Sequence, residues 1–187
     1  VGVQCIQEMQ MKEYFADNIL ISTGGKSYPA TGSTGEGYKL AKQAGHTIVD
    51  AYPALVPVET EGNIPAKLEG LSLKNVKLSL WVDGKKHMEE FGEMLFTGFG
   101  LSGPIVLTLS REVYLPLQED KKVSLSIDLK PALDENKLDV RLQRDLDGNG
   151  KKNIGNLFKL WLPSKLIPVF LELLGLEHDK PAHQITG

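Results

Sequence analysis

The residues best suited to hold a ligand form a glycine-rich loop, ISTGGKSYPATGSTGEG, near the start of the sequence. Glycines let a backbone turn sharply and approach a ligand closely, while hydroxyls and the free N–H groups at a helix start hold an anion or a polar ring edge. Glycine also costs backbone entropy on ordering, which makes it a poor choice for a plain linker. We therefore expect this loop to be shaped for a ligand, with a solvent-exposed connection as the alternative.

Two further stretches imitate nucleotide-binding motifs. Gly25-Lys26-Ser27 matches the end of a phosphate-binding P-loop, but Leu20 stands where that motif needs its first glycine. The stretch Gly98 to Gly103, GFGLSG, matches the dinucleotide fingerprint between an expected strand and an expected helix. Asp128 lies farther on than the roughly 20 residues usual for the ribose-binding acid. Direct NAD binding here remains an alternative to a tight turn that feeds a helix.

No metal site or catalytic set stands out by pattern. Asp145 to Gly150 copies the first half of a calcium-binding EF-hand loop, but Asn156 occupies the position that needs a glutamate. A polar turn between helices explains this stretch better. The four histidines are scattered without ligand spacing, and each is expected at the surface. They are His46, His87, His178 and His183.

Composition and charge restrict the partners. The net charge is −3 over 187 residues, so the chain has no overall basic field and nucleic acid is not an expected partner. No apolar run approaches the roughly 20 residues that span a bilayer, so no membrane association is expected. Cys5 is the single cysteine and cannot form an internal disulfide, which fits a cytoplasmic location.

The elements that position the loop are predicted from hydrophobic periodicity. Two strands are expected within residues 1–22, in VGVQCIQEMQM and DNILIST, before the glycine loop. A helix is expected in GYKLAKQAGH, with Gly45 as its C-terminal cap. The first part of the chain is thus predicted to run strand, loop, helix.

From His46 the sequence is typical of short strands punctuated by prolines. A hairpin is expected across Asp83-Gly84, a pair that favours a tight two-residue turn. A helix should begin at Pro104, and KKVSLSIDLKP should form another strand. After about residue 131 the pattern is helical, so the predicted fold class is α+β.

Three blocks of the sequence occur together, in this order, in a known family. They are ILISTGGKSYPATGSTGEGYKLAKQAGH, AYPALVPVET and GEMLFTGFGLSGPIVLTLS. With them the chain resembles the bacterial NAD(P)/FAD-dependent oxidoreductases that include aminoacetone oxidase, over essentially its whole length. In these flavoproteins a dinucleotide-binding-type FAD domain is interrupted by an inserted domain made of a small β barrel and a helical bundle.

The resemblance implies the domain organisation. Residues 1–45 would be the C-terminal part of the first FAD-domain segment, a remnant of the dinucleotide-binding-type fold. Residues 46–187 would be the inserted, substrate-side domain, with the β barrel over about 46–130 and helices over about 131–187. The family's glycine-rich FAD fingerprint is absent from this sequence. We therefore expect a middle piece that needs the remainder of its FAD domain and does not retain FAD alone.

The resemblance also implies the chemistry, which is hydride transfer between a small organic substrate and FAD. The implied cofactor-binding residues are Thr23, Gly24, Gly25, Ser27, Tyr28, Pro29, Thr31, Gly32, Ser33 and Gly35. The implied substrate-side cleft residues are Phe96, Thr97, Phe99, Gly100, Leu101, Ser102, Gly103 and Pro104. The family commonly has a histidine where Gly98 stands, so no catalytic acid or base is assigned. The alternative function is a non-catalytic module that binds a small ligand or a protein.

Overall fold

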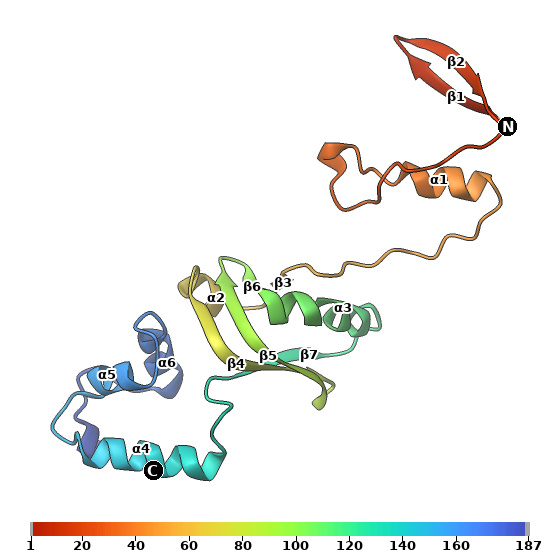
Figure 1. Ribbon diagram of the computed structural model, residues 1–187. Helices are drawn as coiled ribbons and strands as arrows, with labels where there is room; N and C mark the ends of the chain where they lie inside the picture. The colour runs from red at the N-terminus through yellow and green to blue at the C-terminus, as the bar shows by residue number, and fades with distance from the viewer. Residues whose placement is uncertain (1, 186–187) are drawn as a thin grey trace. The chain divides into compact units, whose positions relative to one another are not determined.

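The computed structural model describes residues 2–185. The chain divides into two compact units, Val1–Ala51 and Tyr52–Gly187, which are described separately (Figure 1). All apolar side chains that are buried in the described residues belong to the second unit, between Pro65 and Ala182. Only this unit therefore has a hydrophobic core of its own.

The first unit begins with an antiparallel hairpin of β1 (Gly2–Gln7) and β2 (Gln10–Phe15). Its turn residues, Glu8 and Met9, have φ values of 52° and 61°, the left-handed geometry of a two-residue hairpin turn. The prediction of a second strand in DNILIST is wrong, because QMKEYF pairs with β1 and residues 17–23 are not in a strand.

A short 3-10 helix, η1 (Pro29–Thr31), and helix α1 (Glu36–Gln43) complete the first unit. The predicted helix is confirmed. Gly45 has φ 91° and follows its last turn, where the His46 N–H donates to the carbonyl of Ala41. Glycine is favoured here because a side chain is strained in this conformation.

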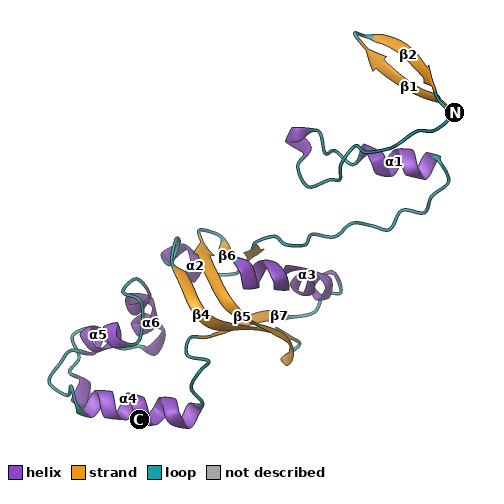
Figure 2. Cartoon of the chain, viewed as in Figure 1, coloured by secondary structure: helices purple, strands orange, loops and turns teal. Residues whose placement is uncertain are grey.

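The second unit contains one antiparallel sheet in the order β3-β6-β5-β4-β7 (Figure 2). Its strands are β3 (Val58–Glu59), β4 (Ser72–Val82), β5 (Lys85–Thr97), β6 (Gly100–Ser102) and β7 (Val123–Asp128). The hairpin predicted across Asp83-Gly84 is confirmed, with φ values of 49° and 75°.

The sheet curls but does not close. Strands β3 and β7 are its edges, and in the described residues they pair only with β6 and β4 respectively. The strands of this sheet lie between Val58 and Asp128 and form an open half-barrel, which is consistent with the predicted barrel-plus-helical domain. The predicted bounds of 46–130 stay a prediction. The predicted α+β class is confirmed.

The core of the sheet lies under helix α3 (Pro104–Gln118), which begins at the predicted proline. Leu78 and Leu80 of β4 are fully buried, and Val106 and Leu109 of α3 are at most 1% exposed. Strand alternation and helical spacing together bury one face of each element. A single-turn helix, α2 (Ile64–Lys67), precedes β4.

The helical part predicted from about residue 131 is present and packs against the sheet part. Its elements are α4 (Glu135–Asp147), α5 (Ile154–Leu157), η2 (Phe158–Leu160), α6 (Leu166–Leu174) and η3 (Ala182–Gln184). Leu166 and Val169 of α6 join the core under the sheet, and Lys67 forms a 2.6 Å ion pair with Glu172. Within residues 2–185, no helix combines the length and apolarity that a bilayer crossing requires.

We predict that residues 52–187 fold without the first unit. Their sheet and helices bury their own apolar faces, so the truncated chain should unfold cooperatively in urea. Residues 2–51 have no buried apolar side chain in the described structure, so a 1–51 peptide should show no cooperative transition. Circular dichroism during urea denaturation measures the unfolding transition of each polypeptide. A gradual, non-cooperative transition of 52–187 would contradict the prediction.

Candidate functional site

The predicted cofactor loop has a defined shape that its own backbone maintains. The Gly35 N–H donates to the Gly25 carbonyl at 3.0 Å, and the Ser33 N–H donates to the Tyr28 carbonyl at 3.2 Å. Gly32 and Gly35 have φ values of 94° and 83°, where other residues are strained. The glycines therefore serve the folding of the loop before any ligand binds.

Two glycines of this region allow the backbone to pack closely. A Cβ atom on Gly37 would lie 2.5 Å from Thr23 Oγ1, and one on Gly24 would lie 2.7 Å from Ser33 Oγ. Contacts this short do not occur for real Cβ atoms, so something would have to shift. Gly25 differs, because its nearest neighbour would be the Tyr38 hydroxyl at 3.5 Å, an ordinary contact.

The structure separates the ten predicted loop residues by accessibility. Gly35 is buried, and Gly25 and Ser33 are half-buried, so these residues mainly support the loop. Thr31 is exposed, but its hydroxyl donates to the Tyr28 carbonyl at 2.9 Å. The other six are exposed, and they are Thr23, Gly24, Ser27, Tyr28, Pro29 and Gly32. Their role in cofactor binding stays a prediction.

The predicted cleft segment forms the end of β5, the strand β6 and the start of α3. A Cβ on Gly100 would lie 2.1 Å from the carbonyl oxygen of Val58, so β3 pairs with β6 only because this residue is glycine. Gly103 has φ 94°, and its Cβ would lie 2.9 Å from the Cα of Met94. Both glycines are therefore required for packing between strands.

This geometry overturns the dinucleotide alternative for Gly98 to Gly103. The fingerprint needs a parallel strand, helix, strand unit, whereas here it connects β5 to β6 in an antiparallel pair. The EF-hand resemblance at Asp145 also has a structural explanation. The carboxylate of Asp145 accepts hydrogen bonds from the Trp161 indole at 3.0 Å and from Arg144, and these lower the pKa of the carboxyl.

Members of the cleft segment differ in accessibility. Phe96 and Leu101 belong to the core, at 5% and 4% exposure, and Gly100 is buried as well. Phe99 is 53% exposed. Pro104 is also exposed, and Thr97, Ser102 and Gly103 are half-buried. Of the large side chains in the segment, Phe99 is thus the one that a ligand can reach.

A hollow of about 900 Å³ lies beside this segment. This volume is within the range of roughly 300 to 1,000 Å³ that small-molecule sites occupy. Its lining combines both polarities and includes Glu59, Thr60, Glu61, Phe96, Leu101 and Lys121. Thr60 was not predicted, and its hydroxyl is buried without a hydrogen-bond partner in the described residues, as is that of Thr97. Only the fold brings Thr60 to this place, since nothing in its local sequence signals it.

The open half-barrel with a helical part defines the class of the second unit. A family model described as the HI0933-like protein barrel and H2TH domain matches residues 52–187. The chain therefore belongs to the HI0933-like family.

Similar proteins include enzymes with different substrates in their names. The chain is 30% identical over 170 residues to the 3-dehydro-bile acid delta(4,6)-reductase of Clostridium scindens. These aligned residues are 91% of the chain and 41% of that protein. It is 28% identical to the ribosomal RNA dihydrouridine synthase of Haemophilus influenzae, over 98% of the chain and 43% of that protein. The chain spans about two fifths of the length of these relatives. Neither name supports aminoacetone oxidase specifically.

We predict that Gly100→Ala destabilises the second unit and Gly98→Ala does not. The new Cβ at position 100 overlaps the Val58 carbonyl, and overpacking of this kind costs roughly 1–3 kcal/mol. At position 98 the nearest atom is the Glu69 carboxylate at 3.3 Å, at the end of a flexible side chain. Urea denaturation of the two variants measures the difference. Equal stabilities would show that β3 does not depend on this close contact.

Proposed function

We propose that this chain is the substrate-side part of an FAD-dependent reductase. The observation that carries the proposal is the family match over residues 52–187, combined with relatives named as a reductase and as a dihydrouridine synthase. Both names describe the addition of hydrogen to an unsaturated carbon skeleton. The shared reaction is therefore hydride delivery to a carbon–carbon double bond, with a proton added at the neighbouring carbon.

The residues of the first unit fit the proposed flavin in part. The outer side of the loop presents the 73% exposed ring of Tyr28, and a Cβ on Gly32 would meet no atom within 4 Å. A planar ring system could thus approach this backbone closely. When bound, the flavin would supply the hydride, and the loop would hold and orient it. The glycine-rich fingerprint that receives the pyrophosphate is absent from this sequence.

Exposed apolar side chains in the first unit favour a further polypeptide partner. Met9 is 99% exposed, Phe15 is 79% exposed and Leu20 is 88% exposed. Apolar surface of this kind is normally buried in a soluble protein or marks an interaction site. We propose that the partner is the remainder of the FAD domain, which would cover the hairpin and complete the nucleotide-binding sheet.

A small molecule is the favoured substrate class, in preference to RNA. Binding to a phosphate backbone depends on clustered lysine and arginine, and this chain has 24 acidic against 21 basic residues. The hollow beside the cleft segment is lined by Glu59 and Glu61 and also by Lys121 and Lys122, so it carries no excess of positive charge that would attract a phosphate backbone. An uncharged unsaturated compound suits this lining of apolar side chains and balanced charges better.

We predict that the longer polypeptide carrying this chain binds FAD and that residues 1–187 alone do not. Absorbance near 450 nm, roughly that of one flavin per protein, should accompany the former only. After anaerobic reduction by NADH or NADPH, the flavin should be reoxidised by a conjugated enone. Absence of flavin from the longer polypeptide would overturn the proposal and favour a non-catalytic binding module.

Variants of the loop test its contribution to flavin binding in that longer polypeptide. Gly37→Ala should lower flavin occupancy severalfold, because its Cβ displaces Thr23 and hence the loop. Lys39→Ala, at an exposed position of the same helix, is the matched control, and occupancy should change little. Flavin content per protein after gel filtration measures both. Unchanged occupancy in Gly37→Ala would make the loop a plain connection.

A further inference from the structure

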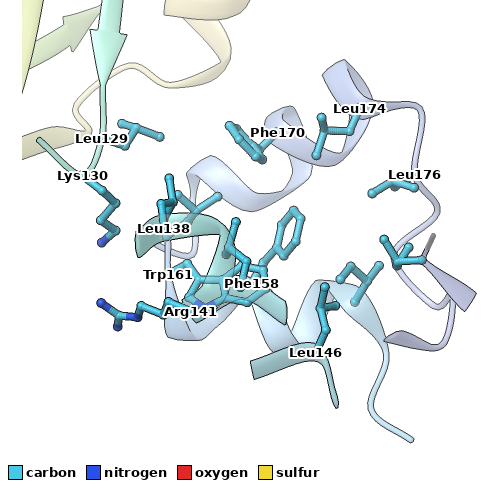
Figure 3. A pocket seen from close by; sticks show the side chains of 14 residues that line it. Leu129, Lys130, Leu138, Arg141, Leu146, Phe158, Trp161, Phe170, Leu174 and Leu176 are labelled. Carbon is cyan, nitrogen blue, oxygen red and sulfur yellow. The ribbon is translucent and has the colours of Figure 1, made fainter. Parts of the chain in front are cut away.

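The helical part contains an apolar pocket that the proposed flavin chemistry does not use. It has a volume of about 290 Å³ and lies between α4, α5, η2, α6 and the segment after β7 (Figure 3). Its walls include Leu138, Leu142 and Leu146 of α4, together with Phe158, Trp161 and Phe170. A pocket of this size whose walls are almost entirely apolar is a candidate site for a ligand.

Helix α4 forms one apolar wall of the pocket. Leu138, Leu142 and Leu146 recur at every fourth position and form one stripe along the helix. None of the three is fully buried, and α4 has no buried residue at all, although all three line the pocket. In a filled bundle this stripe would meet side chains of the other helices. Here the stripe faces the pocket.

Water is a poor occupant of this pocket. A buried water needs about two to four polar partners, and the one polar group of an aromatic wall residue, the Trp161 indole N–H, already donates to Asp145. A pocket with so few polar partners for water favours an apolar ligand. The lining therefore suits a hydrocarbon body.

Two cations lie at one end of the pocket, where their aliphatic stems line it and their charged groups lie outside its apolar walls. Lys130 and Arg141 both line it, and Figure 3 shows their charged groups at one end, with Leu174 and Leu176 at the other. Lys130 is half-buried, and its amine forms no ion pair within the described residues. Arg141 has only a long contact of 3.8 Å to Asp145, whose carboxylate is shared with Arg144. Both cations therefore remain available to an anionic group.

We propose that this pocket binds a medium-chain fatty carboxylate, with its acyl chain along the leucine stripe and its carboxylate at Lys130 and Arg141. Charge complementarity selects the acid group, because arginine and lysine hydrogen-bond strongly to carboxylates. The pocket volume of about 290 Å³ lies at the lower limit for small-molecule sites, so the apolar part of the ligand should be a single slender chain. This proposal does not depend on the proposed flavin chemistry.

Titration of the full 187-residue chain with dodecanoate, below its micelle concentration, tests the proposal. Calorimetry should show saturable binding at one site, and dodecan-1-ol should bind roughly tenfold more weakly because it lacks the charge. In a Trp81→Phe background, Trp161 is the one remaining tryptophan, so its fluorescence should shift during the titration. No saturable binding, or equal affinity for the acid and the alcohol, would overturn the proposal.

Two sets of variants with matched controls locate the ligand. Arg141→Gln combined with Lys130→Gln should weaken dodecanoate binding roughly tenfold and leave dodecan-1-ol unchanged, while Lys151→Gln, at an exposed site outside the pocket, should affect neither. Leu142→Phe should fill the pocket and abolish both, whereas Val140→Phe, at a site that is 66% exposed, should not. Thermal unfolding checks that each variant is folded. Undiminished binding in a folded Leu142→Phe variant would place the ligand elsewhere and overturn the assignment.

Discussion

The second unit depends on a close approach of backbone to backbone at the junction of β5, β6 and α3. Gly100 brings β6 against β3, and Gly103 places the first turn of α3 directly over Met94. Gly92 leaves space for Ile105 of the same helix, since a Cβ there would lie 2.8 Å from its Cγ2 atom. A side chain at Gly92 or Gly103 would separate the helix from the sheet, and one at Gly100 would separate β6 from β3. The core under α3 and the hollow beside it both follow from this contact.

Features of the fold that depend on local sequence could be predicted. Asp83-Gly84 adopts the left-handed turn that connects β4 to β5, and Pro104 begins α3, because turn and helix-start preferences act over a few residues. The hairpin of the first unit could not be predicted in the same way. Its turn residues, Glu8 and Met9, are left-handed without being Gly, Asn or Asp, so the sequence carried no turn signal.

Features that depend on distant contacts were predicted less well. The openness of the sheet reflects the two-residue length of β3, which alternation of side chains does not encode. The glycines of the cleft segment were predicted to face a ligand, and in the structure Gly100 and Gly103 allow close packing of the backbone. Thr60 reaches the hollow because β3 pairs with β6 far along the chain. The glycines in the sequence thus indicated where two backbone segments pack closely. Which side chains line the hollow depends on the fold.

Strand β7 and its continuation divide two spaces of different polarity. Val123, Leu125 and Ile127 alternate along one face of the strand and line the mixed hollow beside the cleft segment. Leu129 continues the alternation but lines the apolar pocket of the helical part. The chain leaves the sheet here, since Lys130 precedes a proline that cannot extend the strand ladder. One sequence of alternating apolar residues therefore lines both the mixed hollow and the apolar pocket, and the proline after Lys130 marks the point where the chain passes from one to the other.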